Sequence, residues 1–90
     1  MIYLNPLKCG LTLGVLIGIA HIAWSVLVVL GLGQEVMDFI FRIHFLGVGF
    51  RVLPFDLTTA TLLVAFTSGV AFLLGYGVAV AINSAVEREA

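Results

Sequence analysis

Two long stretches of this chain contain no formally charged residue, and they constrain its fold more than any other feature. They run from Cys9 to Gly33 and from Leu57 to Val86. A helix needs about 20 apolar residues to cross the roughly 30 Å of hydrocarbon in a bilayer, and both stretches exceed that length. A water-soluble fold of 90 residues has too small an interior to bury two such segments. The sequence therefore predicts an all-α integral membrane protein, built as a hairpin of two transmembrane helices with an amphipathic interfacial helix between them.

The charged and glycine-rich segments divide this single membrane domain, residues 1–90, into parts. The predicted parts are a first span at about 9–32, an interfacial helix at about 34–46, a loop at 47–56, a second span at about 57–83 and a polar tail at 84–90. Asn5-Pro6 is typical of a helix start, and Gly31 and Gly33 are typical of a helix end. Asp56 suits the N-cap of the second span.

An even number of spans predicts that both termini lie on the same side of the membrane. Lys8 and Arg88 belong to that side, and Arg42 and Arg51 belong to the other. Equal positive charge on the two sides gives no orientation by the positive-inside rule. The first apolar stretch is longer than the about 7–15 residues of a signal-peptide core and lacks a small-residue cleavage site, so we expect it to be retained.

The middle segment has the pattern of a helix that lies in the membrane surface. Glu35, Asp38 and Arg42 fall at i, i+3 and i+7 on one face, and apolar residues cover the rest. Asp38 precedes Arg42 by four residues, the favourable order for an exposed ion pair. A helix with one narrow polar stripe is expected in the headgroup plane. The residues predicted to anchor it there, or to dock it on a partner, are Phe39, Arg42, His44, Phe45 and Arg51.

Small residues at four-residue spacing predict where helices touch. The first span contains an uninterrupted GxxxGxxxG run, and such strips let two backbones approach closely. The predicted packing residues are Gly10, Gly14, Gly18 and Ser25 of the first span and Thr61, Ala65, Ser68, Gly75 and Ala79 of the second. Phe72 interrupts the second strip. A further set, Gly69, Gly77 and Ala81, points elsewhere and favours a face that binds another chain.

His21 is the strongest candidate for chemistry, because ionisable residues inside a membrane are rare and often functional. With Gly18 one turn before it, its imidazole could ligate a haem or chlorophyll-type tetrapyrrole. A proton relay is a further alternative. The simpler interpretation is a neutral histidine that donates to a carbonyl or to a hydroxyl across the hairpin, from Ser68, Thr61 or Tyr76. We predict no cofactor, with a tetrapyrrole on His21 as the alternative.

The sequence lacks the residues that several classes of function require. There is no Ser/His/Asp arrangement, no HExxH motif and no phosphate-binding loop, so we expect no enzymatic activity. Cys9 is the only cysteine, which excludes an internal disulfide and a CxxC metal site. A net charge of −1 argues against a nucleic-acid partner. The glycine run resembles that of the rotor subunit of rotary ATPases, but the second span lacks the ion-carrying carboxylate of that family.

Four stretches together resemble small uncharacterised two-span membrane proteins of bacteria. They are Gly10–Gly14, His21–Trp24, Asp38–Phe45 and Gly75–Gly77. The resemblance covers most of the chain and implies the same topology in a bacterial inner or intracytoplasmic membrane. The resemblance identifies no functional residue in this chain.

The leading expectation is a non-enzymatic accessory or structural subunit, which packs within a larger membrane complex or with copies of itself. Its partners would be membrane lipids and membrane protein subunits. One alternative is a tetrapyrrole-associated small subunit of a respiratory or photosynthetic complex, with His21 as ligand. The other is a small homo-oligomeric pore, for which the polar residues of the spans do not form one stripe.

Overall fold

The computed structural model describes residues 3–47 and 49–89, and these residues form three α-helices and no strand. The helices are α1 (Pro6–Val29), α2 (Gly33–Ile43) and α3 (Leu57–Glu89). The prediction of an all-helical fold is confirmed, and both α1 and α3 are long and apolar enough to cross a membrane. Four residues lie outside the described ones: Met1 and Ile2 before the first predicted span, Val48 in the predicted loop and Ala90 in the predicted tail.

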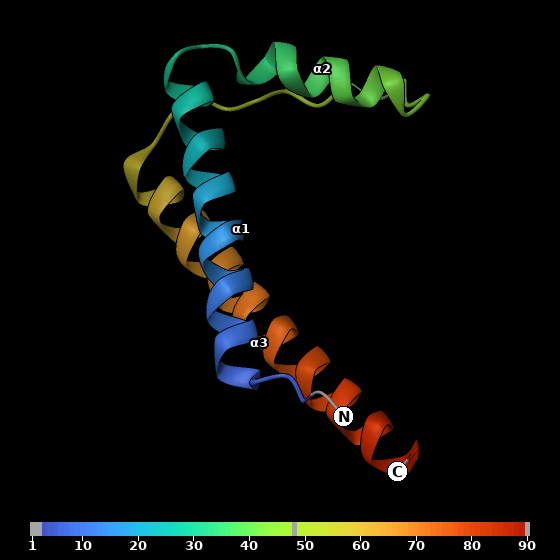
Figure 1. Ribbon diagram of the computed structural model, residues 1–90. Helices are drawn as coiled ribbons and strands as arrows, with labels where there is room; N and C mark the ends of the chain where they lie inside the picture. Colours follow the sequence, from blue (N-terminus) through green and yellow to red (C-terminus); the bar gives the residue numbers. More distant parts are fainter. Residues whose placement is uncertain (1–2, 48, 90) are drawn as a thin grey trace.

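Helices α1 and α3 pack side by side in antiparallel directions, and α2 projects sideways from one end of the pair (Figure 1). The Cα atoms extend over 52 × 31 × 14 Å. Among the described residues, the buried hydrophobic side chains are Ala71 and Ala79. The molecule therefore has a helix–helix seam in place of a hydrophobic core.

Helix α1 begins at Pro6, before the predicted start at Cys9. Asn5 is its N-cap, and the Asn5 side chain accepts a hydrogen bond of 3.1 Å from the Lys8 amide. Proline fits the first helical position, because its missing amide would have no partner there. The helix ends at Val29, where Gly31 takes a φ of +78° and the Leu32 amide donates to the Leu27 carbonyl. This αL ending stops the helix before the predicted boundary at Leu32.

Helix α2 ends at Ile43, although the apolar pattern predicts a helix to Leu46. Phe45 adopts a φ of +60°, and the Leu46 amide donates to the Phe41 carbonyl at 2.8 Å. The chain thereby closes the helix with a Schellman motif, which normally uses glycine at the left-handed position. A left-handed residue with a Cβ costs about 1–2 kcal/mol. Periodicity alone does not reveal this ending.

Helix α3 begins as predicted, at the N-cap Asp56. The Asp56 carboxylate accepts from the Thr59 amide at 2.9 Å, and the Asp56 carbonyl accepts from the Ala60 amide at 2.9 Å. At its other end the helix continues to Glu89, through the segment predicted as a polar tail. Residues 84–89 contain no glycine or proline, and alanine, glutamate and arginine favour helix. With 33 residues the helix is about 50 Å long.

The ion pair that the spacing favours on α2 does not form between its two described partners. Asp38 accepts a hydrogen bond of 2.9 Å from the Gln34 side chain instead. The Arg42 guanidinium lies over the Phe39 ring, 5.6 Å from its centroid. A solvated ion pair at this spacing is worth only about 0.2–0.5 kcal/mol, so a cation–π contact and a neutral donor compete with it easily.

Candidate functional site

The GxxxGxxxG run forms the closest contact between α1 and α3. Gly10, Gly14 and Gly18 are all buried. A Cβ atom added to Gly10 would lie 2.9 Å from the Phe72 ring, and one added to Gly18 would lie 2.6 Å from the Ser68 hydroxyl. Each glycine thus leaves space that a residue of α3 fills. The glycine run therefore serves the packing of α1 on α3 within the hairpin.

Gly75 makes the tightest backbone approach on the α3 side. A Cβ atom added there would lie 2.7 Å from the Cys9 carbonyl oxygen and 3.1 Å from the Gly10 Cα atom. Further along the same seam, Ala79 is 1% exposed. The main chains of α1 and α3 therefore meet directly at this level, with no side chain between them.

The structure does not bring all predicted packing residues into the seam. Ser25 is half-buried, and its hydroxyl donates to the His21 carbonyl of its own helix. Thr61 and Ala65 are exposed. Conversely, Ala71, which is 5% exposed, belongs to the seam although the small-residue pattern omits it. Phe72 also belongs to it, because the missing side chain of Gly10 accommodates its ring.

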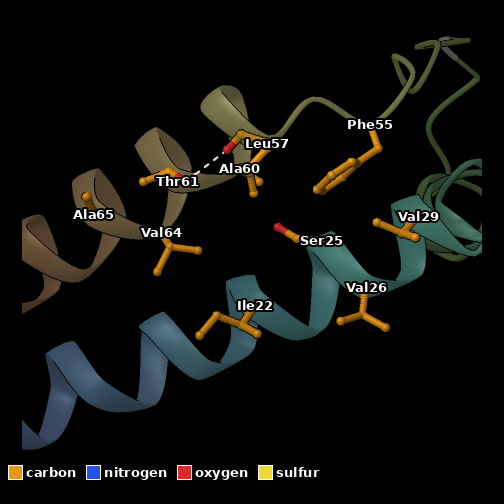
Figure 2. A pocket seen from close by; sticks show the side chains of 10 residues that line it. All are labelled: Ile22, Ser25, Val26, Val29, Phe55, Leu57, Ala60, Thr61, Val64 and Ala65. Carbon is orange, nitrogen blue, oxygen red and sulfur yellow. Dashed lines mark hydrogen bonds between the residues drawn. The ribbon is translucent and has the colours of Figure 1, made fainter.

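Near the end that carries α2, α1 and α3 separate and leave an open apolar hollow of about 510 Å³ (Figure 2). Ile22 and Val26 of α1 face Ala60 and Val64 of α3 across it, and Phe55 covers one end. The wall contains two hydroxyl groups, and each donates to a carbonyl of its own helix. The hollow therefore offers shape and apolar surface but no free polar group from these side chains.

A second hollow, of about 290 Å³, lies between the hairpin, α2 and the segment 50–56. Its lining includes the apolar residues Trp24 and Leu63 and the polar residues Arg51, Asp56 and Thr59. Ser25, Phe55 and Ala60 line both hollows. The lining of this second hollow thus combines apolar residues with one residue of each charge sign.

Two carboxamide side chains hold non-helical backbone at opposite ends of the hairpin, and no spacing pattern in the sequence marks them for this role. Gln34 donates to the Phe50 carbonyl at 2.8 Å and accepts from the Val52 amide at 2.6 Å. Asn83 donates to the Leu4 carbonyl and accepts from the Leu4 amide, both at 2.8 Å. A carboxamide presents one donor and one acceptor side by side, which matches the two main-chain groups of an extended strand.

His21 is half-buried, and its Nδ1 atom lies 2.9 Å from the Ile17 carbonyl oxygen of its own helix. A carbonyl only accepts, so Nδ1 donates and the Nε2 atom of a neutral ring carries the lone pair. That tautomer suits a metal ligand. However, the space beside Gly18 is filled by Ser68 and is not open to a flat ring. The single observed partner is a carbonyl on the same helix.

The residues predicted for interfacial or partner docking spread over α2 and the segment that follows it. Phe45 is 97% exposed, and Phe39, Arg42 and Arg51 are also exposed. The His44 Nδ1 atom lies 2.6 Å from the Ile40 carbonyl oxygen, which also accepts from the His44 amide. Arg42 contacts the Phe39 ring and lines a shallow hollow together with Phe45, whereas Arg51 lines the second hollow.

Gly69 and Gly77 are exposed positions of α3 within the described residues. A Cβ atom added to either residue would have no neighbour within 4 Å. Glycine in a helix interior is less favourable than alanine by about 1 kcal/mol. These two positions therefore lower the helix propensity of α3 without serving any contact inside the described hairpin.

Asp56 provides a pH-dependent cap for α3. The hydroxyl and then the amide of Thr59 donate to the carboxylate, and these bonds lower the pKa of Asp56 below its ordinary value. Because this pKa is lowered, the cap stabilises the folded chain fully at pH values above the ordinary aspartate pKa of about 3.9. That stabilisation is lost as the pH falls through the lowered pKa of Asp56.

We therefore expect the amide resonance of Thr59 to titrate with a midpoint below the ordinary aspartate pKa, as the first turn of α3 loses its cap. NMR in micelles from pH 6 to pH 2 measures this midpoint. Asp56→Asn keeps a capping oxygen without the charge and is expected to remove the titration. A midpoint in the wild type at or above the ordinary value would contradict the cap.

Within residues 3–47 and 49–89, no three His, Cys, Asp or Glu side chains come close enough to hold a metal ion. Comparison with protein-family models, curated proteins and solved structures finds no match to this sequence. The resemblance to two-span bacterial proteins therefore stays a prediction.

Proposed function

We propose that this chain is a two-span membrane hairpin that serves as a non-enzymatic accessory subunit, packed through its outer faces on other membrane helices. In this proposal α1 and α3 cross the bilayer, and α2 lies in the interface at one surface. The partner is a larger membrane complex or further copies of the chain.

The apolar exterior is the observation that carries the proposal. Large hydrophobic side chains project from all parts of both long helices, with Leu16 58% exposed and Phe66 72% exposed. Water would penalise such a surface by roughly 25 cal/mol for each Å² of apolar area. A bilayer or a neighbouring apolar helix removes that penalty, whereas the single seam between α1 and α3 cannot.

The uncovered glycines favour a protein neighbour in addition to lipid. A Cβ atom added to Gly69 or Gly77 would meet open space, and Gly69 borders a groove that Gly14 and Gly18 of α1 also line. Small residues on an outer helix face let a second backbone approach closely, which is how membrane helices gain packing energy. Lipid chains gain nothing comparable from a missing side chain. Both residues therefore mark the face at which we expect another helix.

The test is an affinity pull-down in mild detergent from native membranes, with a native gel and an absorption spectrum of the same band. Co-migration with a much larger species is expected. Gly69→Leu and Gly77→Leu should each shift most of the chain to a smaller species, because a leucine fills the docking face. Ala23→Leu, at an exposed position on α1, is the matched control and should leave the large species intact.

Each other outcome has a defined meaning. A stable monomer of hairpin mass, unchanged by all three variants, would contradict the proposal. A tetrapyrrole absorption band that disappears in His21→Ala would support the cofactor-carrying alternative. A colourless band of this chain alone that conducts ions in liposomes would support the pore.

A further inference from the structure

The second hollow has the chemistry of a phospholipid site. Its lining includes the apolar residues Trp24, Val28 and Leu63 and two charged residues, Arg51 and Asp56. We propose that this hollow binds one phosphoethanolamine lipid, whose phosphate pairs with Arg51 and whose ammonium group pairs with Asp56. The proposal rests on the membrane position given above, because only a membrane supplies this ligand at high concentration.

Depth along the hairpin favours a lipid headgroup. Asp56 caps α3 immediately before the apolar helix begins at Leu57, and Arg51 lies in the extended segment just before it. If α3 spans the bilayer, both charges lie at the boundary between hydrocarbon and headgroups. The apolar wall of the hollow continues from them toward the hydrocarbon, along α1 and α3. A phospholipid has its polar and apolar parts in the same order.

Arg51 is available to bind a phosphate. Its guanidinium forms no hydrogen bond or ion pair with any of the described residues, and the only acidic side chain that shares the hollow is Asp56. The Asp56 carboxylate is already held by the amide and the hydroxyl of Thr59. A guanidinium pairs with phosphate through two parallel N–H groups, which a free arginine at headgroup depth can supply.

One positive and one negative residue in the lining favour a lipid headgroup that carries both charges. A lipid with net negative charge would gain from Arg51 but would be repelled by Asp56. A phosphoethanolamine group carries a phosphate and a primary ammonium, so each of its charges meets an opposite charge. The ammonium also has N–H donors for the remaining acceptor sites of the carboxylate. The first hollow has no charged residue in its lining and offers no such selection.

Trp24 provides a direct readout, since it lines the hollow and is the only tryptophan of the chain. The full chain is reconstituted into vesicles that mix phosphatidylethanolamine and phosphatidylglycerol with equal acyl chains. One lipid at a time carries bromine atoms on those chains, which quench tryptophan fluorescence on contact. Brominated phosphatidylethanolamine is expected to quench Trp24 with an apparent preference of about fivefold, as one unfavourable charge near a membrane surface implies.

Two variants test the assignment of the charges. Asp56→Asn retains a good N-cap and should abolish or reverse the preference for phosphatidylethanolamine. Arg51→Gln should lower the quenching by both lipids, because the phosphate loses its partner. Glu35→Gln removes a charge that does not line the hollow, and it should leave the preference unchanged.

The outcomes distinguish a failure of the proposed lipid site from a failure of the proposed membrane insertion. If no brominated lipid quenches Trp24, the chain is not inserted as proposed and both proposals fail. If both lipids quench equally, or phosphatidylglycerol quenches more strongly, the chain is inserted but the phosphoethanolamine site is wrong. A preference in Asp56→Asn equal to that of the wild type would also overturn it.

Discussion

Replacing Gly75 by alanine is expected to destabilise the packing of α1 on α3 by about 1–3 kcal/mol, the usual effect of an extra methyl group in a tight contact. The new Cβ atom would lie 2.7 Å from the Cys9 carbonyl oxygen. Its neighbours at this point are main-chain atoms, which cannot turn away as a side chain can. The helices themselves must therefore move apart, and the contacts on either side loosen with them.

Gly77→Ala is the matched control, two residues away on the same helix. A Cβ atom there meets nothing within 4 Å. Alanine is a better helix former than glycine, so this variant should leave the stability of the isolated hairpin unchanged or raise it by up to about 1 kcal/mol. The propensity gain is common to both variants. The difference between them therefore isolates the steric effect at the seam.

The measurement is equilibrium unfolding of the purified chain in mixed micelles of mild detergent and SDS. Energy transfer between fluorophores on Tyr3→Cys and Glu87→Cys, in a Cys9→Ser background, reports separation of the helices. Both labelled positions are exposed, and the Leu4–Asn83 hydrogen bonds hold this end of the hairpin together. Equal midpoints for Gly75→Ala and Gly77→Ala would show that the seam is looser than the structure indicates.

The glycine run illustrates what the sequence can predict. Four-residue spacing places Gly10, Gly14 and Gly18 on one strip of a helix, and a strip without side chains favours close packing. The three residues are indeed buried. The pattern could not identify the residue that fills the space. Phe72 breaks the small-residue strip of α3, but its ring lies against Gly10, so the apparent interruption is part of the fit.

The helix boundaries were predictable where a local capping signal exists. Asp56 and Asn5 both have side chains that cap a following helix, and both helices begin after them. The end of α2 was not predictable, because Phe45 adopts a left-handed conformation that its residue type disfavours. The end of α3 was missed for the opposite reason. The charges at residues 87–89 predict a polar tail beyond the second span, but glutamate and arginine also favour helix, and α3 continues to Glu89.

The site outside the seam depends on contacts that no periodic pattern contains. The hollow beside Trp24 exists because the segment 50–56 folds back along α2. The Phe50 carbonyl and the Val52 amide of that segment both form hydrogen bonds with the Gln34 carboxamide, which lies 16 and 18 positions earlier in the sequence. Such a contact between a single polar side chain and distant backbone has no spacing rule. It becomes visible only when the path of the loop is known.

Gln34→Leu is therefore expected to release the segment 50–52 from α2. The substitution removes the acceptor of the Val52 amide and the donor to the Phe50 carbonyl, while it retains a side chain of similar size. Val52 is half-buried, and an unsatisfied group in such a position costs about 1–3 kcal/mol. A loss of about 2 kcal/mol corresponds to roughly 30-fold more frequent local opening.

Hydrogen exchange of the Val52 amide, followed by mass spectrometry of the segment around it, measures this opening. Glu35→Leu is the control at the neighbouring position, where the side chain is exposed and accepts no hydrogen bond from the described residues. It should leave the exchange rate unchanged, while Gln34→Leu should accelerate it by about 30-fold. The ring contact between Phe41 and Phe50, with centroids 5.3 Å apart, is the competing anchor. If exchange stays slow in Gln34→Leu, that aromatic contact holds the segment and the carboxamide is secondary.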